Sequence, residues 1–192
     1  MGHFACSAQA LRRSHRLLLL AATVATLLAA RAEDAPASAP ATDRVGFPAG
    51  SAEKFTVLRT TTDEKNAKQV TVYGNGPAAS VTDRSALPYP NGSVLVMETA
   101  SLKKDAGGKP VADAAGKFRK DQVLGLHVMR REAGFGEAYA TNRTGEWEYV
   151  EYRADGTHLT PPAKSAACAA CHVKAGKEKD FVFKARFTEE KK

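Results

Sequence analysis

Short β-branched and aromatic runs, each bounded by turn signals, fill the middle of the chain and restrict it to a small set of folds. These runs lie at residues 52–62, 69–76, 89–102, 123–132 and 145–157. Asn-Gly within the third run and Asp-Gly at the end of the fifth favour tight turns. Little helix-forming sequence separates the runs, although the first can begin with a helical turn, and parallel strands would need longer crossovers. The pattern predicts an α+β, β-rich domain built on an antiparallel sheet with few helices.

A different composition follows the strands. Pro161 and Pro162 end the strand region, and the stretch after them is rich in Ala and Lys, which favours a helix. This stretch contains Cys168, Cys171 and His172 in the spacing C-x-x-C-H. The apolar residues of the sequence DFVFKARF come next and can cover a site on such a helix.

The first residues have the three parts of an export signal. A basic start with arginines at positions 12, 13 and 16 precedes an apolar run of 14 residues at 17–30, and the small residues Ala30 and Ala32 follow. The apolar run is shorter than the roughly 20 residues of a membrane span, although an uncleaved anchor is an alternative. We therefore expect a signal peptide that directs the protein to the periplasm and is then removed.

The sequence divides into four expected parts. They are a signal peptide over 1–32, a disordered Ala- and Pro-rich linker over 33–45, one domain over 46–188 and a solvated tail over 189–192. The predicted signal holds four arginines and no acidic residue, so the rest of the chain carries 24 basic and 21 acidic residues. A net charge of +3 on a domain of this size does not indicate nucleic-acid binding.

The C-x-x-C-H motif is compatible with four kinds of site. A structural zinc site has four ligands, usually in two separated pairs, and only His127 and His158 lie elsewhere beyond the predicted signal. A thioredoxin-like dithiol opens a helix after the first strand of a β-α-β unit, whereas this motif follows the last strand run. A disulfide between cysteines three residues apart closes too small a loop to gain much entropy.

The fourth kind of site, covalent haem attachment, accounts for every part of the motif. Two thiols one helical turn apart can add to the vinyl groups of haem, and the adjacent histidine can bind the iron. Thioether formation needs reduced thiols in an exported protein, and Cys6 leaves with the signal, so Cys168 and Cys171 have no competing cysteine. We predict one covalently attached haem c, with His172 as the proximal iron ligand.

The ligand opposite His172 has to come from the strands. None of the 20 residues after His172 is Met or His. Alternation along the 123–132 run places His127 and Met129 on one face, and Met97 lies in the preceding run. The candidates for the distal side are therefore Met97, Met129 and His127. Each can equally be an ordinary strand residue, and a five-coordinate iron under an apolar pocket is equally open.

Four segments together resemble the cytochrome P-460 family in order and spacing. They are NGSVLVMET, GEWEYVEYR, CAACH and KDFVFKARF, and the resemblance covers roughly residues 47–187. It implies a β-rich α+β domain in which an antiparallel sheet packs over a c-type haem, commonly as a homodimer. Members of the family include enzymes that oxidise hydroxylamine, and related β-sheet proteins, the cytochromes c′-β, bind nitric oxide at a five-coordinate haem.

One departure from the family pattern bears on activity. By that pattern Cys168 and Cys171 carry the thioether bonds and His172 is proximal. The hydroxylamine-oxidising members have a haem-cross-linking lysine before a glutamate, and here Met97 precedes Glu98. A thioether sulfur cannot form that amine-type cross-link, which speaks against an enzyme.

Three functions follow as hypotheses. The first is a ligand-binding haem protein that takes a small molecule such as nitric oxide. The second is a six-coordinate electron carrier with a redox partner protein, and the third is a hydroxylamine-oxidising enzyme. Aromatic residues can wall the haem or simply pack the core. They are Phe135, Tyr139, Trp147, Tyr149, Phe181 and Phe183.

Overall fold

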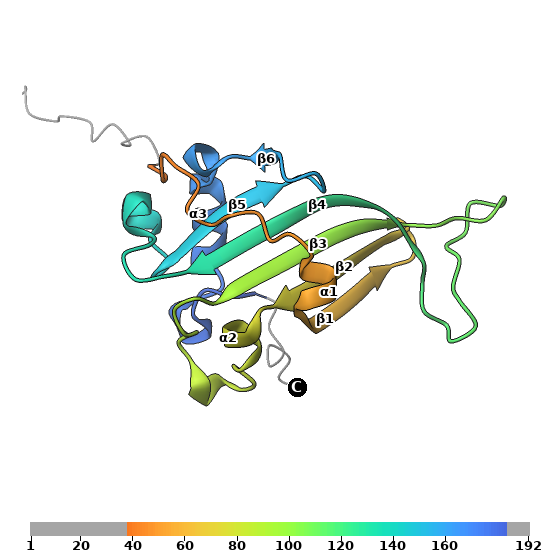
Figure 1. The fold of residues 1–192 in the computed structure, drawn as a ribbon, viewed down its shortest axis with the longest axis horizontal. Helices are drawn as coiled ribbons and strands as arrows, with labels where there is room; N and C mark the ends of the chain where they lie inside the picture. The colour runs from red at the N-terminus through yellow and green to blue at the C-terminus, as the bar shows by residue number, and fades with distance from the viewer. Residues whose placement is uncertain (1–37, 184–192) are drawn as a thin grey trace, which may run out of the picture. The chain divides into compact units, whose positions relative to one another are not determined.

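Six strands form one antiparallel sheet in which every neighbour in space is also a neighbour in the chain (Figure 1). The computed structural model describes residues 38–183. The strands are β1 Thr56–Asp63, β2 Lys68–Gly74, β3 Val94–Leu102, β4 Lys120–Arg131, β5 Trp147–Tyr152 and β6 His158–Thr160. The prediction of a β-rich α+β fold with an antiparallel sheet is confirmed.

The strand runs of the sequence match β1 to β5, and β6 is an addition. Within the predicted run at 145–157, strand β5 ends at Tyr152. Asp155 and Gly156 then form a turn that leads back into β6. Asp155 Oδ1 accepts a hydrogen bond from Thr157 N at 2.9 Å, and Gly156 has a φ of 84°. A strand of three residues carries too little alternation to be recognised from sequence.

The helices of the described part are short. They are α1 Ser51–Lys54, α2 Gly76–Ala79 and α3 Ala166–Val173, with 3₁₀ turns η1 Arg84–Ala86, η2 Glu137–Asn142, η3 Pro162–Lys164 and η4 Lys177–Lys179. In the described residues no helix has the length and apolar character needed to cross a membrane. The eight residues of α3 are too few for a stable isolated helix, so its packing against η2 and β5 must hold it.

The two faces of the sheet carry separate apolar cores because strand side chains alternate. One core contains Leu95, Met129 and Tyr149, together with Ala169 of α3 and Val182 after it. The other core is built on the residues next to these in β3, β4 and β5. Its buried members are Val45, Tyr73, Val96, Leu126, Val128, Val150 and Tyr152. Met129 lies on the face opposite to Leu126 and Val128, in agreement with the alternation predicted along residues 123–132.

Residues 38–45 differ from the expected disordered linker. Val45 is buried in the second core, and Arg44 forms an ion pair with Glu148 of β5. Asp43 accepts hydrogen bonds from Tyr152 Oη at 2.6 Å and from His158 Nε2 at 2.8 Å. An Ala- and Pro-rich composition hides these anchors because their partners lie more than 100 residues away in sequence. The rest of the expected linker, the predicted signal peptide and the tail lie outside the described residues.

Two nearly identical turns follow each other in the long connection between β3 and β4, the arm that projects from the sheet in Figure 1. Asp105 Oδ1 accepts hydrogen bonds from Gly107 N and Lys109 N, each at 2.9 Å. Eight residues later Asp113 Oδ1 does the same for the backbone at 115 and 117, again at 2.9 Å. The sequence repeat D-A-x-G-K therefore encodes a repeated aspartate-capped turn.

Candidate functional site

A cavity of about 550 Å³ lies between α3 and the face of the sheet that carries Leu95 and Met129. Its size falls in the range of roughly 300–1,000 Å³ that is usual for small-molecule and cofactor sites. The lining residues are Val72, Leu95, Met97, His127, Val128, Met129, Tyr149, Val150, Glu151, Ala167, Cys168, Cys171, His172, Val182 and Phe183. All three residues of the C-x-x-C-H motif and all three distal candidates therefore line one space.

The cysteines lie on α3, three residues apart, which places them on the same side of the helix. Both are free thiols, Cys168 half-buried and Cys171 exposed. Burial raises the pKa of the Cys168 thiol, with a smaller contribution from the charge of Glu151. Among residues 38–183, no group of three or more His, Cys, Asp or Glu side chains is placed to hold a metal ion.

His172 has one ring nitrogen committed to the backbone. Nδ1 donates a hydrogen bond to the carbonyl of Phe181 at 2.7 Å, so Nε2 is the nitrogen that can bind a ligand. Burial lowers the pKa of His172, and the Phe181 carbonyl offsets this only in part. The imidazole is therefore neutral at neutral pH, which is the form that binds metals.

Two aromatic rings hold the plane of His172. The Tyr149 ring lies 4.6 Å from it, centroid to centroid, at 32°, and the Phe183 ring lies 5.4 Å away at 61°. Tyr149 is itself fixed because its hydroxyl is hydrogen-bonded to Thr144 Oγ1 at 2.7 Å. The histidine ring cannot rotate freely in this setting.

The Phe181 carbonyl is presented by an unusual turn. Asp180 and Phe181 have φ values of 47° and 61°, in the left-handed region that residues with a Cβ rarely adopt. The Asp180 carboxylate accepts hydrogen bonds from Tyr89 N at 3.0 Å and from Arg131 Nη1 at 3.0 and 3.1 Å. Burial raises the pKa of Asp180, and the Tyr89 N–H and the Arg131 charge act against that rise.

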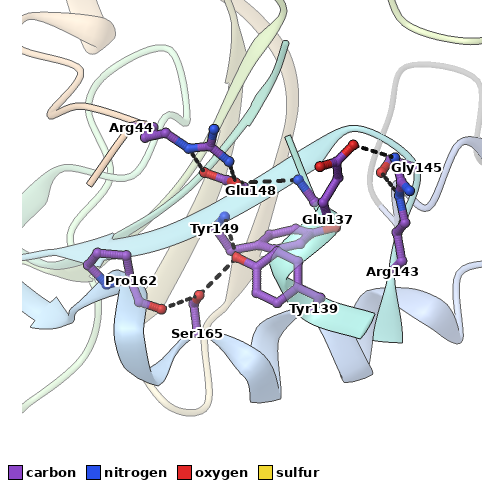
Figure 2. A network of polar contacts seen from close by, with 10 residues as sticks. Arg44, Glu137, Tyr139, Arg143, Gly145, Glu148, Tyr149, Pro162 and Ser165 are labelled. Carbon is purple, nitrogen blue, oxygen red and sulfur yellow. Dashed lines mark hydrogen bonds and ion pairs between the residues drawn. The ribbon is translucent and has the colours of Figure 1, made fainter. Parts of the chain in front are cut away.

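A chain of hydrogen bonds ties the start of α3 to β5 (Figure 2). Tyr149 N donates to Tyr139 Oη at 3.2 Å, Tyr139 Oη is hydrogen-bonded to Ser165 Oγ at 2.8 Å, and Ser165 Oγ donates to Pro162 O at 2.6 Å. Ser165 and Tyr139 are almost completely buried. Since Ser165 directly precedes α3, these hydrogen bonds fix the start of the helix that carries the two cysteines.

A buried carboxylate supports the same region from the other side of β5 (Figure 2). Glu148 is 1% exposed and accepts hydrogen bonds from Arg44 Nε at 3.2 Å and from Gly136 N at 3.3 Å. The Arg44 guanidinium also lies over the Phe135 ring, 4.4 Å from its centroid. The N-terminal segment thereby holds the loop that leads to η2.

The sheet side of the cavity carries one polar pair in an apolar wall. Register places Val72, Met97, His127 and Glu151 side by side across β2 to β5. His127 Nε2 lies 3.2 Å from Glu151 Oε1, and Glu151 Oε2 accepts a hydrogen bond from Thr160 Oγ1 at 2.7 Å. This pair can exchange hydrogen bonds with a polar molecule in the cavity.

The distal candidates differ in how free their ligand atoms are. Met129 is 6% exposed and packs in the core with Leu95 and Tyr149. His127 Nε2 faces Glu151. Met97 is half-buried and lines the cavity wall.

Of the predicted aromatic residues, two line the cavity, Tyr149 and Phe183. Tyr139 and Trp147 pack in the core, Phe135 lies under Arg44, and Phe181 contributes its carbonyl. Sequence reasoning missed Glu151 and Asp180. Glu151 lies inside a predicted strand, where its direction could have been read from alternation with Tyr149, whereas nothing local marks Asp180.

Comparison with protein-family models gives a match. The family model described as Cytochrome P460 matches residues 48–184, which is most of the chain and includes the whole sheet and α3. No curated protein matches the chain. The match covers nearly the same residues as the resemblance described from sequence, and the chain therefore belongs to the cytochrome P460 family of haem cytochromes.

Proposed function

We propose that the protein is an exported cytochrome with one haem c, attached at Cys168 and Cys171, that binds a small ligand such as nitric oxide. His172 would bind the iron through Nε2. One observation carries the proposal: His172 Nδ1 is held by the Phe181 carbonyl beside a cavity that both cysteines line. This arrangement leaves the coordinating nitrogen and the two thiols on the same cavity.

The residues fit a covalently held haem. The thiols are free and one helical turn apart, and the adjacent imidazole is neutral because burial lowers its pKa. The cavity wall is mostly aliphatic and aromatic, as suits the ring of a porphyrin. When bound, haem supplies an iron that can change oxidation state and bind diatomic molecules.

The surrounding residues determine what such a site does. Tyr149 and Phe183 set the rotation of the His172 ring, and the Phe181 carbonyl sets its tautomer. Apart from the His127–Glu151 pair, the sheet side of the cavity is mostly apolar, with Val72 and Leu95 in it, which favours an uncharged ligand. Export is supported by the basic and apolar segments of residues 1–32.

A six-coordinate electron carrier is the second candidate, and the position of Met97 favours it. Met97 lines the cavity and is only half-buried, so its sulfur is a candidate iron ligand. A methionine ligand raises the reduction potential, and the protein would then serve a redox partner protein. Met97 at the cross-linking position weakens the third candidate, hydroxylamine oxidation.

Absorption spectra of the purified ferrous protein, with and without nitric oxide or CO, test the proposal. The proposal predicts a high-spin ferrous spectrum that shifts on addition of either gas. A low-spin spectrum that ignores CO would favour the electron carrier instead. A strongly red-shifted ferrous band with turnover of hydroxylamine would favour the enzyme.

A further inference from the structure

We propose that Asp180 is a positioning residue for His172, because its carboxylate fixes the turn that presents the Phe181 carbonyl to His172 Nδ1. The inference rests on the proposed function, in which His172 binds the haem iron. It assigns a role to a buried acidic residue outside the C-x-x-C-H motif. The role is to set the strength of the hydrogen bond behind the iron ligand.

The turn needs an external anchor. Two successive residues with side chains, Asp180 and Phe181, have left-handed backbone, which aspartate tolerates better than most residues but which is unfavourable for Phe181. The hydrogen bonds inside the turn are local: Phe181 N donates to Gly176 O at 2.9 Å and Val182 N to Lys179 O at 3.1 Å. Local bonds of this kind form in many turns, so they do not by themselves select this strained one.

The Asp180 side chain supplies that anchor. It is 5% exposed, and its carboxylate binds Arg131, the last residue of β4, and the backbone of Tyr89, which precedes β3. These partners lie 49 and 91 residues away in sequence. The turn is thus tied to the sheet, and the sheet also carries Tyr149 against the His172 ring.

The hydrogen bond that results controls the histidine as a ligand. A strong acceptor on Nδ1–H makes the imidazole more electron-rich at Nε2 and stabilises ferric over ferrous iron. The ring plane is held separately by Tyr149 and Phe183. Loss of the Asp180 anchor should therefore weaken the hydrogen bond without removing His172 from the site.

The test compares Asp180→Ala, Asp180→Asn and Glu146→Gln in the haem-loaded protein. Asn tolerates left-handed backbone and can still accept from Tyr89 N, so it should rescue part of the effect. Glu146 is the matched control, because its Oε2 binds the same Arg131 at 3.0 Å and its substitution by Gln also removes one negative charge. The readouts are the reduction potential and solvent exchange of the His172 Nδ1 proton, followed by NMR in the ferrous CO form.

In Asp180→Ala we expect a higher reduction potential and about tenfold faster proton exchange, the factor that corresponds to one lost hydrogen bond. Asp180→Asn should shift both in the same direction by less, and Glu146→Gln should leave the exchange rate unchanged. Unchanged exchange in both Asp180 variants would overturn the inference, and Asp180→Asn alone decides if Asp180→Ala does not fold. A wild-type protein without a haem-bound histidine would instead overturn the proposed function.

Discussion

Tyr139→Phe removes one oxygen from the hydrogen-bond chain at the start of α3, and its cost can be worked out. Tyr139 Oη accepts a hydrogen bond from Tyr149 N. At this edge of β5, strand β6 pairs only with residues 151 and 152, so it does not reach Tyr149. Without the hydroxyl, this buried N–H has no acceptor, whereas Ser165 Oγ keeps its bond to Pro162 O. An unsatisfied buried donor costs about 1–3 kcal/mol.

The expected loss in stability is therefore about 2 kcal/mol, or roughly 4–8 °C in Tm for a domain of this size. Thermal and urea unfolding, followed by circular dichroism, measure it. Tyr152→Phe is the matched control, because Tyr152 Oη donates to Asp43, whose carboxylate also accepts from His158 and is open to water. We expect the control to lose less than Tyr139→Phe, because it leaves no buried donor without an acceptor. Equal losses in the two variants would refute the reasoning about the orphaned N–H.

Three further predictions concern the cavity and the N-terminal segment. Met97→Leu should leave the ferrous absorption spectrum unchanged if the site binds external ligands, and a conversion from low to high spin would identify Met97 as the iron ligand instead. Arg44→Ala should lower the free energy of unfolding by about 1–2 kcal/mol, because the buried Glu148 carboxylate would keep only its hydrogen bond from a backbone N–H. An unchanged urea midpoint would contradict this. Burial alone would raise the pKa of Asp43, but the hydrogen bonds from a backbone N–H, from His158 and from a tyrosine outweigh it and lower the pKa below 3.8. The stability that Asp43 contributes is then complete above about pH 4 and is lost as the pH falls through the folded-state pKa, so Asp43→Asn should flatten the acid limb of a plot of Tm against pH.

Local sequence patterns predicted the sheet and the C-x-x-C-H site, but they did not predict the contacts that position them. Turn dipeptides such as Asn-Gly, and the alternation of side chains along a strand, are encoded within a few residues. For this reason β1 to β5 match the predicted runs. The site depends on pairs far apart in sequence, such as Asp180 with Arg131 and Arg44 with Glu148. A single acidic residue in a polar stretch looks like a solvated side chain until its distant partner is known.

The N-terminal segment shows the same limit. Ala- and Pro-rich sequence usually lacks enough apolar surface to fold. Here Val45 is buried in one core, Ala39 packs against the other, and two charged neighbours, Asp43 and Arg44, bind the sheet. The average composition of such a segment does not reveal that a few particular side chains bind it to the sheet.

The mass of the purified protein after complete denaturation tests the central claim most directly. The account predicts a chain that begins near residue 33 and keeps the mass of one haem after denaturation, and a Cys168→Ala, Cys171→Ala double variant whose haem is released. Cys6→Ala is the control and should keep its haem. A wild-type protein whose haem is extracted by acid and organic solvent, or a double variant that retains it, would contradict the account.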